Sequence, residues 1–342
     1  MKKQVYLKDV CEKGSSNIAQ KDLESNQGAY PIYGASGLIK HVDFFKQDKP
    51  YIAIVKDGAG VGRTMLLPAY SSVIGTMQYI FPKDNIHIRY LYHALSWMNL
   101  GKYYTGATIP HIYFKDYQDE PLMLPSMEEQ EEIVSVLDKL DQLVEQRKQQ
   151  LSKLDELVKS RFIEMFGDPI NNDKGLSTIS GDRLFKLSNG KTLPDEKRLN
   201  SGIPAYGGNG ISWYTDEVLC DHDTIIIGRV GFQSGNVHYA KAPLWVTDNA
   251  MYLSELFIKD CELGYLCALM EHIDFTRYQD AGDLKKITQK PFMQMLYLLP
   301  PHEQQKEFLR FVEQTDKAKF EVQKSLEKLE TLKKALMQKY FG

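Results

Sequence analysis

Two glycine-rich segments hold the residues best suited to binding chemistry. They run KDGAGVGRT at residues 56–64 and GRVGFQSG at residues 228–235. A phosphate-binding loop needs G-x-x-x-x-G-K-[ST], but Asp57 replaces its first glycine and Arg63 its lysine. Arg63 also breaks a dinucleotide-binding fingerprint, which needs glycine at that position. We therefore interpret both segments as glycine turns or hairpins that present polar side chains.

The sequence contains no recognisable catalytic motif. It has neither the H-E-x-x-H metal motif nor the G-x-S-x-G nucleophile elbow. The N-P-P-[FYW] or D-P-P-[FYW] tetrapeptide of amino-methyltransferases is missing too, because isoleucine follows Asp168-Pro169. The four cysteines form no C-x-x-C pair, so we expect buried or free thiols and no structural zinc. We expect no metal and no cofactor in this chain.

The remaining polar residues suit the recognition of DNA base edges. Arg, Lys, Asn and Gln make bidentate contacts in the major groove, and His, Ser, Thr and Tyr reach bases or phosphates. The candidates in the first half are Lys40, His41, Lys56, Arg63, Gln78, Thr108 and His111. Those in the second half are Asn209, Trp213, Arg229, Gln233, Asn236, His238, Asn249, Lys285 and Lys286. Their recurrence at comparable places in both halves favours a binding surface over scattered solvated residues.

These candidates belong to a unit that occurs twice. The pattern P-x-Y-G-x-x-G stands at residues 31–37 and returns 173 residues later at 204–210. Leu-Pro pairs at 124–125 and 299–300 begin matching segments at an offset of 175. Nearly constant offsets along the whole chain indicate one structural unit used twice.

Each unit is expected to contain a globular part and a long helix. Short β-branched runs between glycine turns predict strands, and a helical stretch interrupts each globular part, so the fold class is α+β. We place the globular parts at 1–125 and 166–300, and the long helices at 126–165 and 301–342. Proline at each helix start and glycine at each helix end fit these boundaries.

A heptad of apolar residues runs along both long helices. Its positions are Ile133, Leu137, Leu140, Val144, Leu151, Leu154 and Val158, then Phe308, Val312, Val322, Leu326, Leu329 and Leu336. A lone helix could not bury such a seam, so we predict an antiparallel intramolecular coiled coil within a pseudo-twofold internal repeat. Net charges of −4 and +2 on the two helices favour their pairing with each other.

Composition places the chain among globular proteins. Of 342 residues, 43% are hydrophobic and 25% are charged. No apolar run is long enough to cross a membrane and no signal peptide is visible, so we expect a cytoplasmic protein without membrane contact. The overall net charge of −3 divides into +3 for residues 1–125 and −4 for residues 166–300. An acidic second part binds a polyanion weakly, so partner subunits are expected to supply part of any DNA affinity.

The whole chain resembles the specificity subunit of type I restriction-modification systems. The resemblance rests on the paired P-x-Y-G-x-x-G segments, on T-G-A-T-I-P at 105–110, on the two Leu-Pro helix starts with their Glu and Gln residues, and on Met-Phe-Gly at 165–167. It implies two target-recognition domains, one for each half of a split site in double-stranded DNA. It also implies a coiled coil that fixes the spacer between the halves. The second copy departs from the first at 281–285, where A-G-D-L-K replaces the G-A-T-I-P run.

The resemblance further implies that catalysis belongs to partner subunits. Two methyltransferase subunits would use S-adenosylmethionine, and restriction subunits would use ATP and Mg²⁺ to translocate and cut DNA. Two alternatives stay open on the residues alone. One is a self-contained DNA methyltransferase or nuclease component, which the missing motifs disfavour. The other is a coiled-coil scaffold whose globular domains bind proteins.

Overall fold

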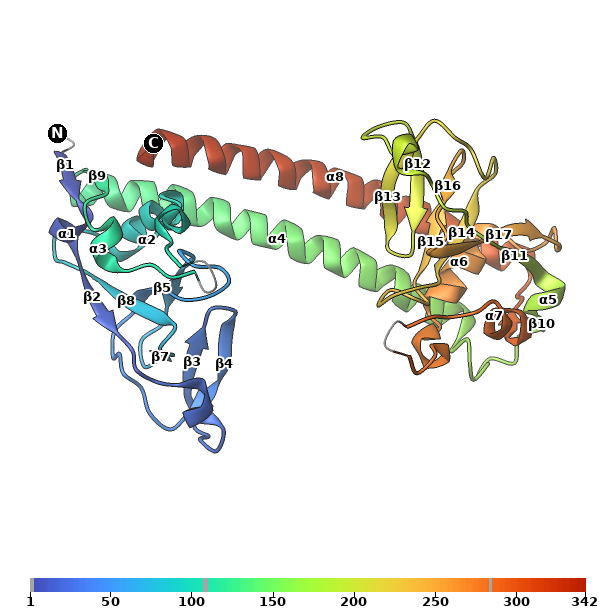
Figure 1. The fold of residues 1–342 in the computed structure, drawn as a ribbon, viewed down its shortest axis with the longest axis horizontal. Coiled ribbons are helices and arrows are strands. Elements are labelled where there is room, and N and C mark those ends of the chain that lie inside the picture. Colours follow the sequence, from blue (N-terminus) through green and yellow to red (C-terminus); the bar gives the residue numbers. More distant parts are fainter. Residues whose placement is uncertain (1–2, 107–109, 283–284) are drawn as a thin grey trace. The chain divides into compact units, whose positions relative to one another are not determined.

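The computed structural model of the chain describes residues 3–106, 110–282 and 285–342 (Figure 1). The chain divides into two compact units. Unit 1 comprises Met1–Lys148 and Lys324–Gly342, and unit 2 comprises Gln149–Gln323. Each unit therefore contains one globular part and a portion of both long helices.

The elements of the first half of the chain recur in the same order in the second half. The first half contains β1 (Lys3–Tyr6), α1 (Leu7–Val10), β2 (Cys11–Ser15), η1 (Gln20–Leu23), β3 (Tyr30–Gly34), β4 (Gly37–Val42), β5 (Tyr51–Val55), β6 (Thr64–Leu67), β7 (Ser72–Val73), β8 (Met77–Pro82), α2 (Ile88–Trp97), η2 (Leu100–Tyr103), α3 (Phe114–Tyr117), β9 (Pro121–Leu124) and α4 (Met127–Phe166). The second half contains β10 (Thr178–Ser180), α5 (Gly181–Leu184), β11 (Phe185–Asn189), η3 (Asp195–Lys197), β12 (Ile203–Gly207), β13 (Gly210–Thr215), β14 (Thr224–Gly228), β15 (Val237–Ala240), β16 (Trp245–Val246), β17 (Ala250–Leu256), α6 (Leu263–Glu271), η4 (Phe275–Tyr278), α7 (Lys290–Gln294), β18 (Leu296–Leu298) and α8 (His302–Phe341). The predicted doubled α+β unit is thereby confirmed.

The sheets repeat as well. The strand order β2-β8-β5-β6 in unit 1 corresponds to β11-β17-β14-β15 in unit 2, and β4-β3-β7 corresponds to β13-β12-β16. The β3–β4 hairpin is irregular between Ile32 and Tyr33, and β12–β13 is irregular between Ala205 and Tyr206. These two places are 173 residues apart, so the repeat extends to local distortions of the backbone.

A continuous apolar run forms the centre of each four-stranded sheet. Strand β5 is buried at every position, because it has a neighbour on each edge and packing on both faces. Ile52 and Ile54 pack in the cluster that includes α2, whereas Tyr51, Ala53 and Val55 pack in the cluster of the three-stranded sheet. Strand β14 is buried throughout in the same way.

The long helices run antiparallel to each other within each unit. In unit 1, the early turns of α4 share a core with the last turns of α8, where Leu137 and Met337 are buried. In unit 2, the last turns of α4 meet the first turns of α8, and Phe162 lies edge-on to Phe308 with ring centroids 5.5 Å apart. Arg161 Nη2 lies 2.9 Å from Glu307 Oε1 beside this contact. All thirteen residues of the predicted heptad are buried or half-buried.

A buried glutamine joins each long helix to the globular part before it. Gln130 accepts a hydrogen bond from the backbone N–H of His87 over 2.8 Å and donates to Asn85 O and Pro125 O. Both glutamines are fully buried. The amide of Gln305 makes three bonds of the same kind, with Glu262 N, Asp260 O and Pro300 O, each 2.9 Å long. The Gln in the helix-start motif therefore ties the helix to the loop before α2 or α6.

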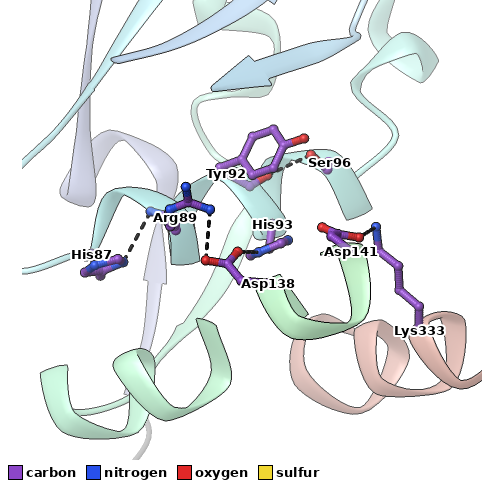
Figure 2. A network of polar contacts seen from close by, with 8 residues as sticks. All are labelled: His87, Arg89, Tyr92, His93, Ser96, Asp138, Asp141 and Lys333. Carbon is purple, nitrogen blue, oxygen red and sulfur yellow. Dashed lines mark hydrogen bonds and ion pairs between the residues drawn. The ribbon is translucent and has the colours of Figure 1, made fainter. Parts of the chain in front are cut away.

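Helix α2 is held against α4 by a polar network, which Figure 2 shows. Asp138 on α4 accepts from Arg89 Nη1 over 2.8 Å, and its second oxygen lies 3.1 Å from His93 Nε2. Burial lowers the pKa of His93, although the hydrogen bond to Asp138 opposes this effect. An ion pair between Lys333 and Asp141 links α8 to α4 nearby. Side chains of the globular part and both long helices thus form one polar contact region in unit 1.

Unit 2 has a cavity at the corresponding place. Gly264 and Ala268 of α6 stand where α2 carries Arg89 and His93. A cavity of about 620 Å³ lies there, and its lining includes Gly264, Ala268 and Val312 of α8. Beyond the shared glutamine bonds, α2 and α6 therefore face the long helices with different side chains.

All four cysteines are buried free thiols, as predicted. Burial raises the pKa of Cys11 and of Cys261 to about 12, so both thiols stay protonated and unreactive at neutral pH. No helix in the described ranges is both long enough and apolar enough to span a membrane.

Candidate nucleic-acid interface

In unit 1, the first glycine segment is joined to residues 110–112 by two backbone hydrogen bonds. Gly58 N donates to Pro110 O over 2.9 Å, and Ile112 N donates to Lys56 O over 2.9 Å. The segment is thereby held between the end of β5 and a part of the chain about fifty residues later. We call this joined pair of segments the loop frame.

Unit 2 builds the same loop frame from different residues. Gly231 N donates to Lys285 O over 2.8 Å, and Ile287 N donates to Arg229 O over 2.9 Å. Every partner lies 173 or 175 residues after its counterpart in unit 1. The backbone of the frame is therefore common to the two domains.

Glycine is required where each segment turns back. Gly62 N donates to Val55 O and Gly235 N donates to Gly228 O, both over 2.8 Å. The φ angles of Gly62 and Gly235 are +85° and +96°, in the region that disfavours residues with a Cβ. A Cβ on Gly62 would also lie 2.3 Å from the backbone nitrogen of Gly101. The interpretation of both segments as glycine turns is confirmed.

The side chains on the two loop frames differ, although the backbones match. The corresponding pairs are Lys56 and Arg229, Asp57 and Val230, Ala59 and Phe232, Gly60 and Gln233, Arg63 and Asn236, Pro110 and Lys285, and His111 and Lys286. A common frame with different side chains allows two domains of one fold to recognise different chemical patterns.

In unit 1, the frame carries three of the predicted residues, Lys56, Arg63 and His111. Arg63 is exposed, and its Nη1 donates to Ala35 O in the β3–β4 turn over 3.1 Å. Lys56 Nζ lies 3.6 Å from Asp57 Oδ2, and His111 Nε2 lies 3.1 Å from Thr105 Oγ1. A cavity of about 430 Å³ opens between the glycine segment and the hairpin turn; its lining includes Ser36, Ala59 and Arg63.

Three other predicted residues of unit 1 lie away from this frame. Lys40 Nζ donates to Leu23 O over 2.7 Å, so its charge ties β4 to η1. His41 is exposed on β4 opposite Pro31. Gln78 is only 5% exposed because it lies within β8 between two other strands. Gln78 therefore cannot contact DNA in this conformation, and its place in the sheet corrects the prediction for it. Thr108 lies outside the described residues.

In unit 2, the frame gathers most of the predicted residues. Arg229 is half-buried, and its Nη1 donates to Asp248 O over 3.0 Å. Asn236 Nδ2 donates to Gln233 Oε1, which orients both amides. Lys285 is half-buried and Lys286 is exposed on the adjoining segment.

The β12–β13 turn packs on the same frame. A Cβ on Gly208 would lie 3.2 Å from Gly228 Cα and 3.5 Å from Asn249 O. Asn209 in this turn and Asn249 are both exposed. The turn thus adds the Asn209 amide, beside that of Asn249, to the surface around the glycine segment.

Trp213 and His238 have other surroundings. The Arg198 guanidinium lies over the Trp213 ring, 4.0 Å from its centroid, so one face of the indole is already occupied. His238 stands on β15 opposite Ile226, and its Nε2 is buried without a hydrogen-bond partner among the described residues. Within the described part of the chain, neither side chain has a hydrogen bond or ring contact with the loop frame.

Sequence reasoning missed one residue of the frame. Phe232 at the tip of the second glycine segment is 92% exposed. The prediction rested on hydrogen-bonding residue types, and a phenyl group has no hydrogen-bonding atom. Phe232 lies between Gly231 and Gln233, in a segment otherwise made of small and polar residues. This position was the signal in the sequence that could have indicated an exposed phenyl group.

Two copies of one domain, with different side chains on matched loop frames, define the class of the chain as a doubled-domain protein. The family comparison agrees with this class. The family described as "Type I restriction modification DNA specificity domain" matches the chain twice, over residues 2–155 and 179–334. The chain belongs to this family, so the resemblance inferred from its motifs is confirmed.

Two related proteins match the chain over a smaller part of its length. A stretch of 129 residues is 29% identical to the EcoprrI type I restriction enzyme specificity subunit of Escherichia coli. A stretch of 138 residues is 31% identical to the MjaIX specificity subunit of Methanocaldococcus jannaschii. Each match covers 37% of this chain and 31% of the relative, so the chain matches about a third of the length of these proteins.

Solved structures resemble the fold over its whole length. The S subunit of a type I restriction-modification system from M. genitalium superposes with a TM-score of 0.68 at 18% identity, covering 100% of this chain and 96% of that one. A chain from a study of complex assembly and conformational transition in a type I R-M system gives 0.57 at 15% identity, covering 99% and 97%. At these identities the likeness concerns the fold alone.

Proposed function

We propose that this chain is the subunit that recognises a bipartite DNA target for a type I restriction-modification complex. One domain recognises each half-site. The observation that carries the proposal is the loop frame, which repeats its backbone bonds in both domains and changes its side chains. Arginine, lysine, asparagine and glutamine on these frames are the residue types that distinguish base pairs in the major groove.

The long helices supply the spacing in this proposal. Each is 40 residues long, which corresponds to roughly 60 Å at about 1.5 Å per residue. Two weak binding domains on a stiff connector gain effective concentration when the half-sites have the matching separation, and they lose it otherwise. The connector therefore selects the number of untouched base pairs between the half-sites.

Partner subunits supply catalysis in this proposal. Methyltransferase subunits that use S-adenosylmethionine bind the long helices and the domains, and ATP-dependent, Mg²⁺-dependent restriction subunits join them in the cytoplasm. The long helices expose large apolar side chains suited to such contacts, namely Val136, Leu157, Ile163, Phe320 and Leu332. Phe320→Asp or Glu131→Lys should reduce the amount of modification subunit that co-purifies. Undiminished co-purification would remove helix docking from the proposal.

The function is tested by selecting bound sequences from a random DNA library with the purified chain and its modification subunit. The expected result is two short conserved blocks separated by a fixed number of unselected base pairs. Binding without sequence preference would contradict the proposal and would favour a protein-binding scaffold. Methyl transfer by this chain alone with S-adenosylmethionine would contradict its non-catalytic role.

A further inference from the structure

Phe232 is an exposed aromatic side chain in the candidate interface. Its exposed fraction of 92% is higher than that of any other large hydrophobic residue in the described chain. The counterpart on the first loop frame is Ala59, so the phenyl group belongs to the second domain only.

The turn that presents Phe232 is held in place on both sides. Gly231 N donates to Lys285 O over 2.8 Å, and Ser234 N donates to Gly231 O over 3.0 Å. The side chain of Gln279 donates to Ser234 O over 2.7 Å. An ordered backbone lowers the entropic cost of fixing the phenyl group against a ligand.

The neighbours of Phe232 limit what this ligand can be. Arg229, Gln233 and Lys286 stand on the same loop frame as Phe232, and they carry groups that bind phosphates and polar base edges. A phenyl group has no hydrogen-bonding atom, so on a base edge it can recognise only an apolar feature. In the major groove that feature is the 5-methyl group of thymine.

Charge argues against the alternative of an intercalating wedge. Wedge residues act in proteins that bend DNA and wrap it on a basic surface. Residues 166–300 carry a net charge of −4, which opposes such wrapping. An edge contact needs no bending.

We propose that Phe232 contacts the 5-methyl group of a thymine in the half-site recognised by the second domain. The inference rests on the proposed function and makes it more specific. Phe232 is then a specificity-determining residue that distinguishes thymine from unmethylated pyrimidines at one position.

Deoxyuridine provides the test, because it removes only the methyl group and keeps base pairing. Binding of the complex with the modification subunit is measured on probes in which each thymine of the second half-site is replaced in turn. One probe should bind the wild-type complex roughly fourfold more weakly, which is the effect of one lost methyl contact of about 0.8 kcal/mol. The Phe232→Ala complex should bind that probe and the thymine probe equally. Phe257→Ala, at an exposed phenylalanine outside the frame, should behave as wild type.

Three results would overturn the contact. The first is a second half-site that contains no thymine. The second is that Phe232→Ala weakens binding of the thymine probe and of the deoxyuridine probe by the same factor. The third is that the Phe232→Ala complex loses the modification subunit. The second result would indicate stacking or a wedge, and the third a protein contact. If the wild-type complex bound no sequence selectively, the proposed function itself would fail, and the contact with it.

Discussion

At the scale of residues, the two loop frames keep their backbone bonds while their side chains change. The sequence pointed to Arg229, Gln233 and the lysines of this surface because polar residues beside glycine turns are typical of binding loops. It misplaced Gln78, since the burial of a polar residue within a strand depends on which strands lie beside it. It missed Phe232 because a single exposed phenyl group looks like a core residue until its surroundings are known.

Arg229 should determine specificity in one half-site only. Arg229→Ala removes a guanidinium that can bind a base edge with two donors, a contact worth about 1–3 kcal/mol. Selection from a DNA library should therefore show relaxed preference at one position of the second half-site and an unchanged first half-site. Arg183→Ala removes the same charge from an exposed position of α5 and serves as the control. Equal weakening on all sequences would identify Arg229 as a phosphate contact.

The buried amide of Gln305 should be important for stability. The Gln305 side chain is fully buried, and Gln305→Ala removes the partner of one N–H and two carbonyl groups. A buried group left unpaired costs about 1–3 kcal/mol. The free energy of unfolding in denaturant should fall by at least about 2 kcal/mol. Gln304→Ala changes the exposed neighbour and should have little effect. Equal stability of the two variants would contradict the role of the amide.

At the scale of elements, apolar periodicity predicted both long helices and their seam, because a heptad is visible in sequence. The contacts that attach each globular part were not predictable. Asp138 lies 49 residues from Arg89 and 45 from His93 along the chain, and only the packing of α2 on α4 brings it to them. The corresponding positions 264 and 268 of α6 hold glycine and alanine, so the repeat did not reveal this contact either.

Acid should weaken this attachment in unit 1. Burial lowers the pKa of His93, so the folded protein holds the neutral ring, whereas the unfolded chain is protonated near pH 6.5 and below. Stability should therefore fall as the pH drops below about 6.5. His93→Gln stays neutral and should lose less thermal stability between pH 7 and pH 5.5 than wild type. His41→Gln changes an exposed histidine and should keep the wild-type loss of thermal stability between pH 7 and pH 5.5. If His93→Gln also kept this loss, a group other than His93 would be responsible for it.

At the scale of the whole molecule, the repeat was predictable because its offsets stay near 173 to 175 from the first strands to the last helix. Sequence reasoning divided the chain at the ends of the long helices. The compact units instead divide within the helices, because each globular core includes turns of both α4 and α8. Such sharing follows from the packing of each globular core against turns of both helices, which the heptad alone does not specify.

The central claim is that two recognition domains and a helical spacer define one bipartite DNA target. Its most direct test inserts one heptad into α4 and one into α8 at corresponding positions. The methylated adenines are then mapped in cells that carry the altered chain and its modification subunit. The insertion adds roughly 10 Å, or about three base pairs at 3.4 Å each. We predict two unchanged half-sites separated by a longer spacer. An unchanged spacer, or a single uninterrupted target, would contradict the account.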